Sequence, residues 1–288
     1  MGERGYPYSI FARPAGLAVY ALAGLENTST GRFIPYVMGV ARNVLAGPGQ
    51  TVTGVDIVMD IPLDHYVDVQ LGELPSEART GPDRFRLQAN IDLAGEGVIA
   101  REINGLEIDV LRGRDASRPF RFTMQPALEG ALRDGRYRIE AGWFTGDFDG
   151  QPYTVAVERG VTSVDDTIVM SDFLGIPQAT APEYGAMIPS DRVFRWESDG
   201  PDPAFQIVLI IGADGNSWWR MIVAGDVREA PVPDLSGIPT LGDLPPGYIT
   251  WGVFAITIPD YDFDAFRYAD LNDIYWTRWS ADFFLAQR

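Results

Sequence analysis

Tyr137-Arg138-Ile139-Glu140-Ala141 alternates apolar with charged side chains. Successive side chains of a β-strand point to opposite faces, so this alternation predicts a strand with one buried and one solvated face. The same period recurs at residues 153–158, 85–91 and 120–124. Glycine and proline interrupt the chain roughly every 8 to 12 residues, which is typical of β-sandwiches rather than of alternating strands and helices. The sequence therefore predicts an all-β chain.

Two parts of the chain resemble each other. Residues 52–59 match residues 161–170, apart from two extra residues in the second segment. Two upstream pairs of segments match in the same order, namely Pro35-Tyr36-Val37 with Pro152-Tyr153-Thr154, and Ala23-Gly24-Leu25 with Ala141-Gly142-Trp143. Such an order indicates an internal duplication, with chance similarity among short strands as the alternative.

The duplication predicts tandem β-sandwiches of a transthyretin-like or immunoglobulin-like kind. We expect a first sandwich at residues 1–72 and a second at residues 73–178. The first lacks counterparts of the strands expected at 85–91 and 120–124, so it is incomplete. Its open edge predicts self-association or completion by a strand of another chain.

Three motifs of the second copy resemble the carboxypeptidase regulatory-like module, a transthyretin-type fold common in bacterial surface proteins. They are Gly135-Arg136-Tyr137, Pro152-Tyr153 and the closing segment 166–170. The resemblance implies an accessory module, and it implies no catalytic residues.

The C-terminal part, residues 179–288, has a different character. Its alternation begins at Phe194-Arg195-Trp196, and residues 244–255 combine a Pro-Gly turn with alternating apolar residues. This pattern resembles fibronectin type III domains, which implies that Tyr248 is the corner tyrosine and Trp196 the core tryptophan. The tail from residue 260 onward is too long for one closing strand and is rich in aromatic residues.

The composition excludes several kinds of chemistry. The 288 residues carry 40 acidic side chains against 23 arginines, with a formal charge of −17, no lysine, no cysteine and the single histidine His65. These absences exclude thiolate and Schiff-base catalysis, a P-loop and a Cys/His zinc site. The acidity argues against a nucleic-acid partner.

No apolar run reaches 18 residues, so we expect no transmembrane segment. Residues 17–25 resemble a signal peptide, and the alternative is that they form a β-strand.

Tryptophans suggest a binding site in the C-terminal part, where five of the seven lie after residue 217. Trp218, Trp219, Trp276 and Trp279 are candidates for a platform on which sugar rings stack. The alternative is that they are covered by a neighbouring domain or by the long tail.

Acidic residues offer a candidate metal site. Asp260, Asp262 and Asp264 alternate, so a strand would place the three carboxylates on one face, where calcium could bind. The alternative is a solvated face opposite buried aromatic residues. Asp147-Phe148-Asp149-Gly150 lacks the full calcium-loop pattern and predicts a hairpin turn. His65 has no partner motif and is expected at the surface.

From these patterns we expect a non-enzymatic modular protein that acts outside the cytoplasm, at the cell surface, as an outer-membrane-associated lipoprotein or in secreted form. It would serve as a spacer or an adhesion module with a protein or glycan partner, and without a cofactor other than the calcium considered above. The first alternative is a carbohydrate-binding module that uses the C-terminal tryptophans. The second is a glycoside hydrolase with two carboxylates, although no pair can be chosen among so many acidic residues.

Overall fold

The computed structural model describes residues 8–10, 15–29, 32–72, 84–99, 106–109, 119–144, 152–162, 167–213, 217–234, 237, 244 and 246–288. Within these ranges the regular structure consists of β-strands and short 3-10 helices. The prediction of an all-β chain is therefore confirmed. No helix in the described ranges has the length and apolarity needed to cross a bilayer.

The strands in chain order are β1 (Ala15–Asn27), β2 (Arg32–Ala46), β3 (Ile61–Pro62), β4 (His65–Leu71), β5 (Arg84–Asp92), β6 (Val98–Ile99), β7 (Leu106–Asp109), β8 (Phe120–Gln125), β9 (Arg136–Phe144), β10 (Tyr153–Val161), β11 (Ile168–Met170), β12 (Gln178–Ala181), β13 (Val193–Glu197), β14 (Phe205–Gly212), β15 (Ser217–Ala224), β16 (Glu229–Pro231), β17 (Tyr248–Thr257) and β18 (Arg278–Gln287). The 3-10 helices are η3 (Gly130–Leu132), η4 (Phe263–Ala265), η5 (Tyr268–Leu271) and η6 (Asp273–Tyr275).

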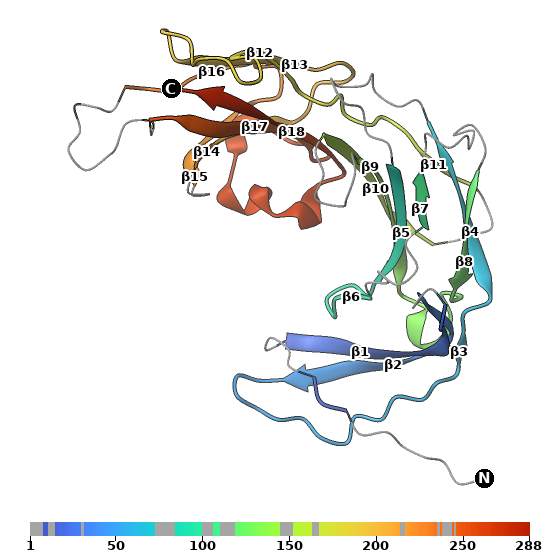
Figure 1. Cartoon of the computed structure of the whole chain (residues 1–288). Helices are drawn as coiled ribbons and strands as arrows, with labels where there is room; N and C mark the ends of the chain where they lie inside the picture. The colour runs from blue at the N-terminus through green and yellow to red at the C-terminus, as the bar shows by residue number, and fades with distance from the viewer. Residues whose placement is uncertain are drawn as a thin grey trace.

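One nine-stranded sheet runs through the central and C-terminal parts, in the order β15-β14-β17-β18-β10-β9-β5-β6, with β7 also paired to β5. It contains strands from both sides of the boundary that we expected at residue 178. The junction is β18, which pairs antiparallel with β17 along its whole length and with β10 through residues 278–281. Figure 1 shows the resulting arc, with the β1–β2 hairpin and the C-terminal part at its two ends.

A sandwich forms the central part. The apolar sides of β5 and β9 pack against the small sheet β11-β4-β8, and this core includes Val69, Leu87, Phe120, Ile139 and Met170. Strand β4 lies within the range expected for the first unit, yet it pairs with β8 and β11.

The N-terminal part is a small sheet, β1-β2-β3. The registers of the two matched hairpins differ, since Gly24 lies opposite Pro35 in β1–β2 whereas Gly142 lies opposite Val155 in β9–β10. The closing segments differ, because residues 168–170 form β11 whereas residues 51–60 form no strand. Instead, this segment lies against β2, where a Cβ atom on Gly39 would meet Val58 O at 2.2 Å. Met38 and Val40 of β2 contribute to the central core.

In the C-terminal part, both faces of the large sheet are covered. The small sheet β12-β13-β16 packs on one face, where Trp196 is 2% exposed and lies in the core, as expected. Residues 258–276, which include η4 to η6, lie against the other face through Tyr261, Phe263 and Trp276. Tyr248 begins β17 and is 55% exposed.

Candidate ligand-binding face

The inner side of the arc is lined by one face of β5, β9 and β10 (Figure 1). Strand alternation explains what this face carries. Tyr137 and Ile139 of β9 point into the central core, so Arg138 and Glu140 between them point to the inner side. We call this surface the inner face.

The strand register aligns side chains across the inner face. In one row, each residue lies opposite the next on the neighbouring strand. This row consists of Arg86 (β5), Gly142 (β9), Val155 (β10) and Trp279 (β18). Neighbouring strands lie about 4.8 Å apart, so this row spans about 14 Å. A parallel row joins Gln88, Glu140 and Val157.

Charged side chains converge in the middle of the inner face. Arg138 Nη2 lies 3.3 Å from Glu140 Oε2. Burial raises the pKa of the Glu140 carboxyl, while the charges of Arg138, Arg86 and Arg159 oppose this shift. Burial, followed by the charge of Arg138, lowers the pKa of the Arg159 guanidinium. A desolvated cluster of charges is the kind of environment found at functional sites and also in structural ion-pair networks.

Arg159 also connects this cluster to the segment that follows η5. Its Nη2 donates hydrogen bonds to Trp276 O at 3.0 Å and to Asp273 O at 3.4 Å. The Nε atoms of Arg138 and Arg159 are buried and have no hydrogen-bond partner among the described residues. An unsatisfied buried donor is costly, so both groups would gain from an acceptor.

Aromatic rings border the charged cluster. The rings of Phe144 and Tyr153 are 5.7 Å apart and belong to a small apolar cluster that also includes Trp279. Burial raises the pKa of Tyr153 to about 12. Trp276 and Trp279 meet edge to face with centroids 6.0 Å apart, and Trp276 Nε1 donates to Asp270 O at 3.0 Å. Both indoles are only partly buried.

The four candidate tryptophans do not form one platform. Trp276 and Trp279 lie together beside the inner face. Trp219 instead packs into the core under β12-β13-β16, on the opposite face of the sheet, because it lies in one row with Ile210 and Trp251. Trp218 belongs to β15, and its side chain lies outside the described residues.

The three candidate calcium ligands do not share the face of a strand, so that expectation was wrong. Pro259 and Asp260 form a turn, with Asp260 at a φ of 53°, and η4 follows. Asp262 uses its side chain to cap this short helix by accepting a hydrogen bond from Asp264 N at 3.0 Å. Among the residues that the structure describes, no three His, Cys, Asp or Glu side chains are grouped so as to hold a metal ion.

The remaining candidates give no site. His65 begins β4 with an exposed side chain, and its Nδ1 lies 2.8 Å from Asp64 Oδ1. The segment at residues 147–150 lies outside the described residues.

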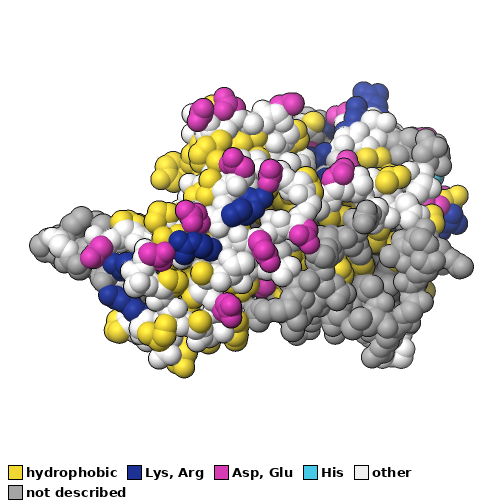
Figure 2. Space-filling model, turned by 90° about the horizontal axis from the view of Figure 1, so that it is seen from above, with side chains coloured by type: hydrophobic (Ala, Val, Ile, Leu, Met, Phe, Trp, Pro, Cys, Tyr) yellow, Lys and Arg dark blue, Asp and Glu magenta, His cyan; other side chains and the backbone are white. Residues whose placement is uncertain are grey.

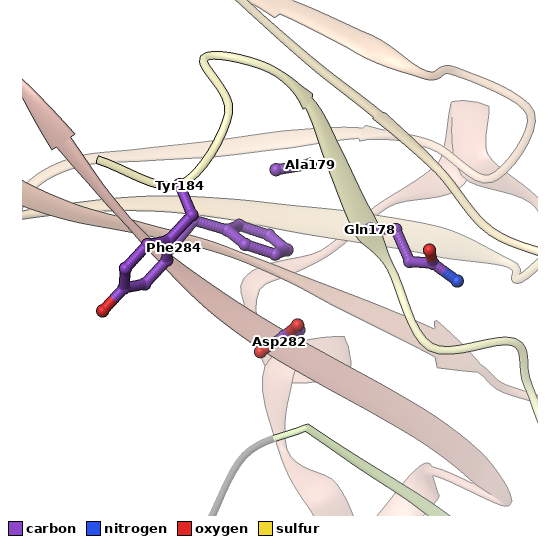
Figure 3. A pocket seen from close by; sticks show the side chains of 5 residues that line it. All are labelled: Gln178, Ala179, Tyr184, Asp282 and Phe284. Atoms are coloured by element: carbon purple, nitrogen blue, oxygen red, sulfur yellow. The ribbon is translucent and has the colours of Figure 1, made fainter. Parts of the chain in front are cut away.

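A hollow of about 90 Å³ lies between β12 and β18, and no motif in the sequence indicated it. Figure 3 shows its lining side chains, Gln178, Ala179, Tyr184, Asp282 and Phe284. Asp282 is 1% exposed, and its Oδ1 accepts a hydrogen bond from Phe283 N at 2.7 Å. The hollow offers a small ligand a carboxylate and two aromatic rings, but it presents a much shorter surface than the inner face.

No protein-family model and no curated protein matches this sequence.

Proposed function

We propose that this chain is a non-enzymatic binding protein that acts outside the cytoplasm and contacts its ligand through the inner face. The observation that carries the proposal is the row of side chains across β5, β9, β10 and β18. Arg86 lies at one end of this row and the partly exposed Trp279 at the other, on one side of a continuous sheet, while Gly142 and Val155 between them are buried.

The architecture supports a role as a spacer or adhesion module. The central and C-terminal parts are joined by the hydrogen-bonded pairing of β10 with β18, in which Thr154 lies opposite Ser280. Their side chains add two buried bonds, from Thr154 Oγ1 to Leu174 O and from Ser280 Oγ to Gly175 O. A sheet that crosses the junction resists bending there, so the inner face is presented with a fixed curvature.

A carbohydrate is the ligand class that this surface favours. Aromatic rings such as those of Trp276 and Trp279 offer apolar faces for sugar rings. Arg159, which donates to Trp276 O, and Arg138 next to it supply hydrogen-bond donors on the same face. Protein ligand sites commonly combine aromatic surface with a few fixed polar groups in this way.

Intrinsic tryptophan fluorescence tests the proposal directly. The protein would be titrated with a panel of neutral and acidic oligosaccharides, together with the variants Trp276→Ala and Trp279→Ala. We expect a saturable shift that at least one of these variants loses while its circular dichroism stays unchanged. Tyr248→Ala is the matched control, since Tyr248 is an exposed aromatic residue at the distant start of β17. The absence of a response to every saccharide would contradict the proposal.

One observation bears on the hydrolase alternative. A carboxyl group with a raised pKa, such as Glu140, is suited to act as a general acid. The titrated saccharides should therefore also be analysed for cleavage products. Cleavage that Glu140→Gln abolishes would replace the non-enzymatic proposal with a glycosidase.

A further inference from the structure

We infer that the inner face selects saccharides carrying an anionic group, which Arg138 and Arg159 bind while an adjacent sugar ring contacts Trp279. This inference rests on the proposed function and specifies the ligand of the same face. The anionic group is a carboxylate, as in a uronic acid, or a sulfate ester, because both present the oxygen acceptors that guanidinium groups match.

The hydrogen-bond inventory of the cluster supports an anionic ligand. Arg138 Nη2 pairs with Glu140, and Arg159 Nη2 donates to two backbone carbonyl groups. The Nε atoms of both arginines are buried and have no acceptor among the described residues. A guanidinium group presents five N–H donors in a planar fork. The contacts with Glu140 and the backbone carbonyl groups use only the Nη2 atoms, so the Nη1 groups of these two partly buried arginines are the donors that a ligand on the inner face can reach.

The balance of charges in the cluster determines whether it attracts an anion. Glu140 is the half-buried carboxylate within it, while Asp92 and Asp273 at its margin are exposed. Solvated charges at the margin are screened, whereas those in the partly buried centre act strongly on a group bound between them. Arg138 and Arg159 together therefore outweigh the carboxylate of Glu140 at the centre.

The chain as a whole disfavours a polyanion. Its formal charge is −17, and Figure 2 shows acidic side chains spread over the face seen from above. Long-range repulsion would oppose a nucleic acid or a densely charged polymer. An isolated acidic group on an otherwise neutral saccharide avoids this repulsion and still reaches the arginines.

The length of the row fits an oligosaccharide. Arg86 and Trp279 lie at the ends of a row that spans about 14 Å, given a strand spacing of about 4.8 Å. A ligand that contacts both ends of this row is longer than a single sugar, whereas Arg159 lies nearer the indoles, because its Nη2 donates to Trp276 O at 3.0 Å. Acidic peptides share the anionic group, but they lack the flat ring that the indole favours, so they serve as a comparison.

Isothermal titration calorimetry with three matched probes tests the inference. The probes are a uronic-acid trisaccharide, its carboxyl-reduced neutral counterpart and its sulfated analogue, and a short poly-glutamate peptide is the comparison. We expect at least one anionic trisaccharide to bind about tenfold or more tightly than the neutral one, as a charge-assisted hydrogen bond would give. Binding of the uronate or of the sulfate identifies the source of the anionic group, and either result supports the inference.

Variants assign the effect to the cluster. Arg138→Gln and Arg159→Gln should reduce the affinity for the acidic trisaccharide to that for the neutral one. Arg195→Gln should leave it unchanged, because Arg195 lies on β13 and pairs with Asp191 and Glu229. Glu140→Gln removes the competing carboxylate, so it should tighten binding of the acid. This variant keeps the inference testable if the arginine variants do not fold.

The outcomes separate the two proposals. Equal binding of neutral and acidic trisaccharides, unaffected by Arg138→Gln, would overturn the anion inference and leave the proposed function standing. Binding of poly-glutamate as tight as that of the acidic saccharide would overturn the assignment to a saccharide. A failure of all saccharides to bind would overturn both.

Discussion

The guanidinium group of Arg42 in β2 lies 2.6 Å from Glu96 Oε1, in the turn between β5 and β6. The same guanidinium donates to Asp134 Oδ1 at 2.8 Å and to Ala131 O at 2.6 Å, at the end of η3. Glu96 Oε2 also accepts from Asn43 N at 2.8 Å. One half-buried side chain therefore fastens the N-terminal hairpin to two turns of the central sandwich.

Replacing Arg42 should loosen this attachment. In Arg42→Gln, the carboxylates of Glu96 and Asp134 lose their cationic partner. We expect a lower thermal midpoint, by roughly 2–4 °C for each kcal/mol lost. Differential scanning fluorimetry would measure this shift. Arg195→Gln is the control, since Arg195 forms exposed ion pairs with Asp191 and Glu229 that should contribute little. Equal midpoints in the two variants would contradict the assignment.

The same contact predicts a pH dependence. The hydrogen bond from Arg42 lowers the pKa of Asp134 to about 2, and Arg42 followed by the Asn43 amide lowers the pKa of Glu96 below its ordinary 4.5. A carboxyl with a lowered folded-state pKa stabilises the fold above its unfolded-state pKa. That contribution is lost as the pH falls through the folded-state value. Stability measured by urea unfolding should therefore fall between about pH 4.5 and pH 2 more steeply in the parent than in Arg42→Gln. Parallel profiles would show that the pair does not carry this linkage.

Two buried tryptophans provide a matched comparison of a satisfied and an unsatisfied indole. Trp196 Nε1 donates to Gln206 Oε1 at 2.8 Å, and Gln206 Nε2 in turn donates to Gly225 O and Val227 O. Trp251 Nε1 is buried with no partner among the described residues. Both indoles lie in the core beneath β12-β13-β16.

Replacement by phenylalanine should separate the two sites. Trp196→Phe leaves the buried Gln206 carbonyl without its donor, which costs about 1–3 kcal/mol beyond the lost volume. Trp251→Phe loses volume but also removes an unsatisfied donor, so it should destabilise less. The free energies of unfolding from denaturant titrations would show the difference. A larger loss in Trp251→Phe would contradict the hydrogen-bond argument.

Local alternation was sufficient to predict the strands. Tyr137, Ile139 and Ala141 lie in the core as their spacing indicated, and Arg138 and Glu140 lie on the other face. The same alternation misled us at Asp260, because a proline at position 259 and a left-handed residue after it form a turn. Period 2 predicts a strand only where turn residues do not interrupt it.

The candidate site depended on pairings that no local pattern encodes. Arg86, Arg138 and Arg159 are far apart in the sequence and meet because β5, β9 and β10 are neighbours in the sheet. The concentration of tryptophans drew attention to Trp276 and Trp279, which lie together beside the inner face. It could not separate them from Trp219, because the face that each residue occupies is fixed by sheet register. The pairing of β18 with β10 was equally beyond a local pattern.

Gly175 allows two loops to approach closely. A Cβ atom at this position would lie 1.7 Å from Asp199 O, which is a backbone atom that cannot rotate away. Gly175→Ala should therefore destabilise by at least about 1–3 kcal/mol, the usual range for overpacking. Gly237→Ala is the control, because a Cβ atom there meets nothing within 4 Å. Its free energy of unfolding should change by less than about 0.5 kcal/mol. Similar losses in both variants would show that the close approach does not limit stability.

Strand β1 lies at the edge of the N-terminal sheet, which consists of β1-β2-β3. Its 13 residues carry no charge before Glu26 and contain no proline. Ala18 N donates to Glu96 O at 3.1 Å on the side away from β2, so the central sandwich covers the start of this edge. Towards the hairpin end, Leu25, Ile34 and Tyr36 are exposed. A long apolar edge of this kind is a template for pairing with another strand.

We therefore predict that the protein associates with itself through β1 as its concentration rises. Static light scattering over a dilution series should show a rising mean mass. Ala21→Lys places a charge on the side of β1 opposite to Tyr20 and Leu22, which pack on the central core, so it should favour the monomer without disturbing that packing. Ala265→Lys adds the same charge at an exposed position in η4 and should leave association unchanged. A monomer at every concentration would show that the edge is protected, whereas association that resists Ala21→Lys would place the contact on another surface.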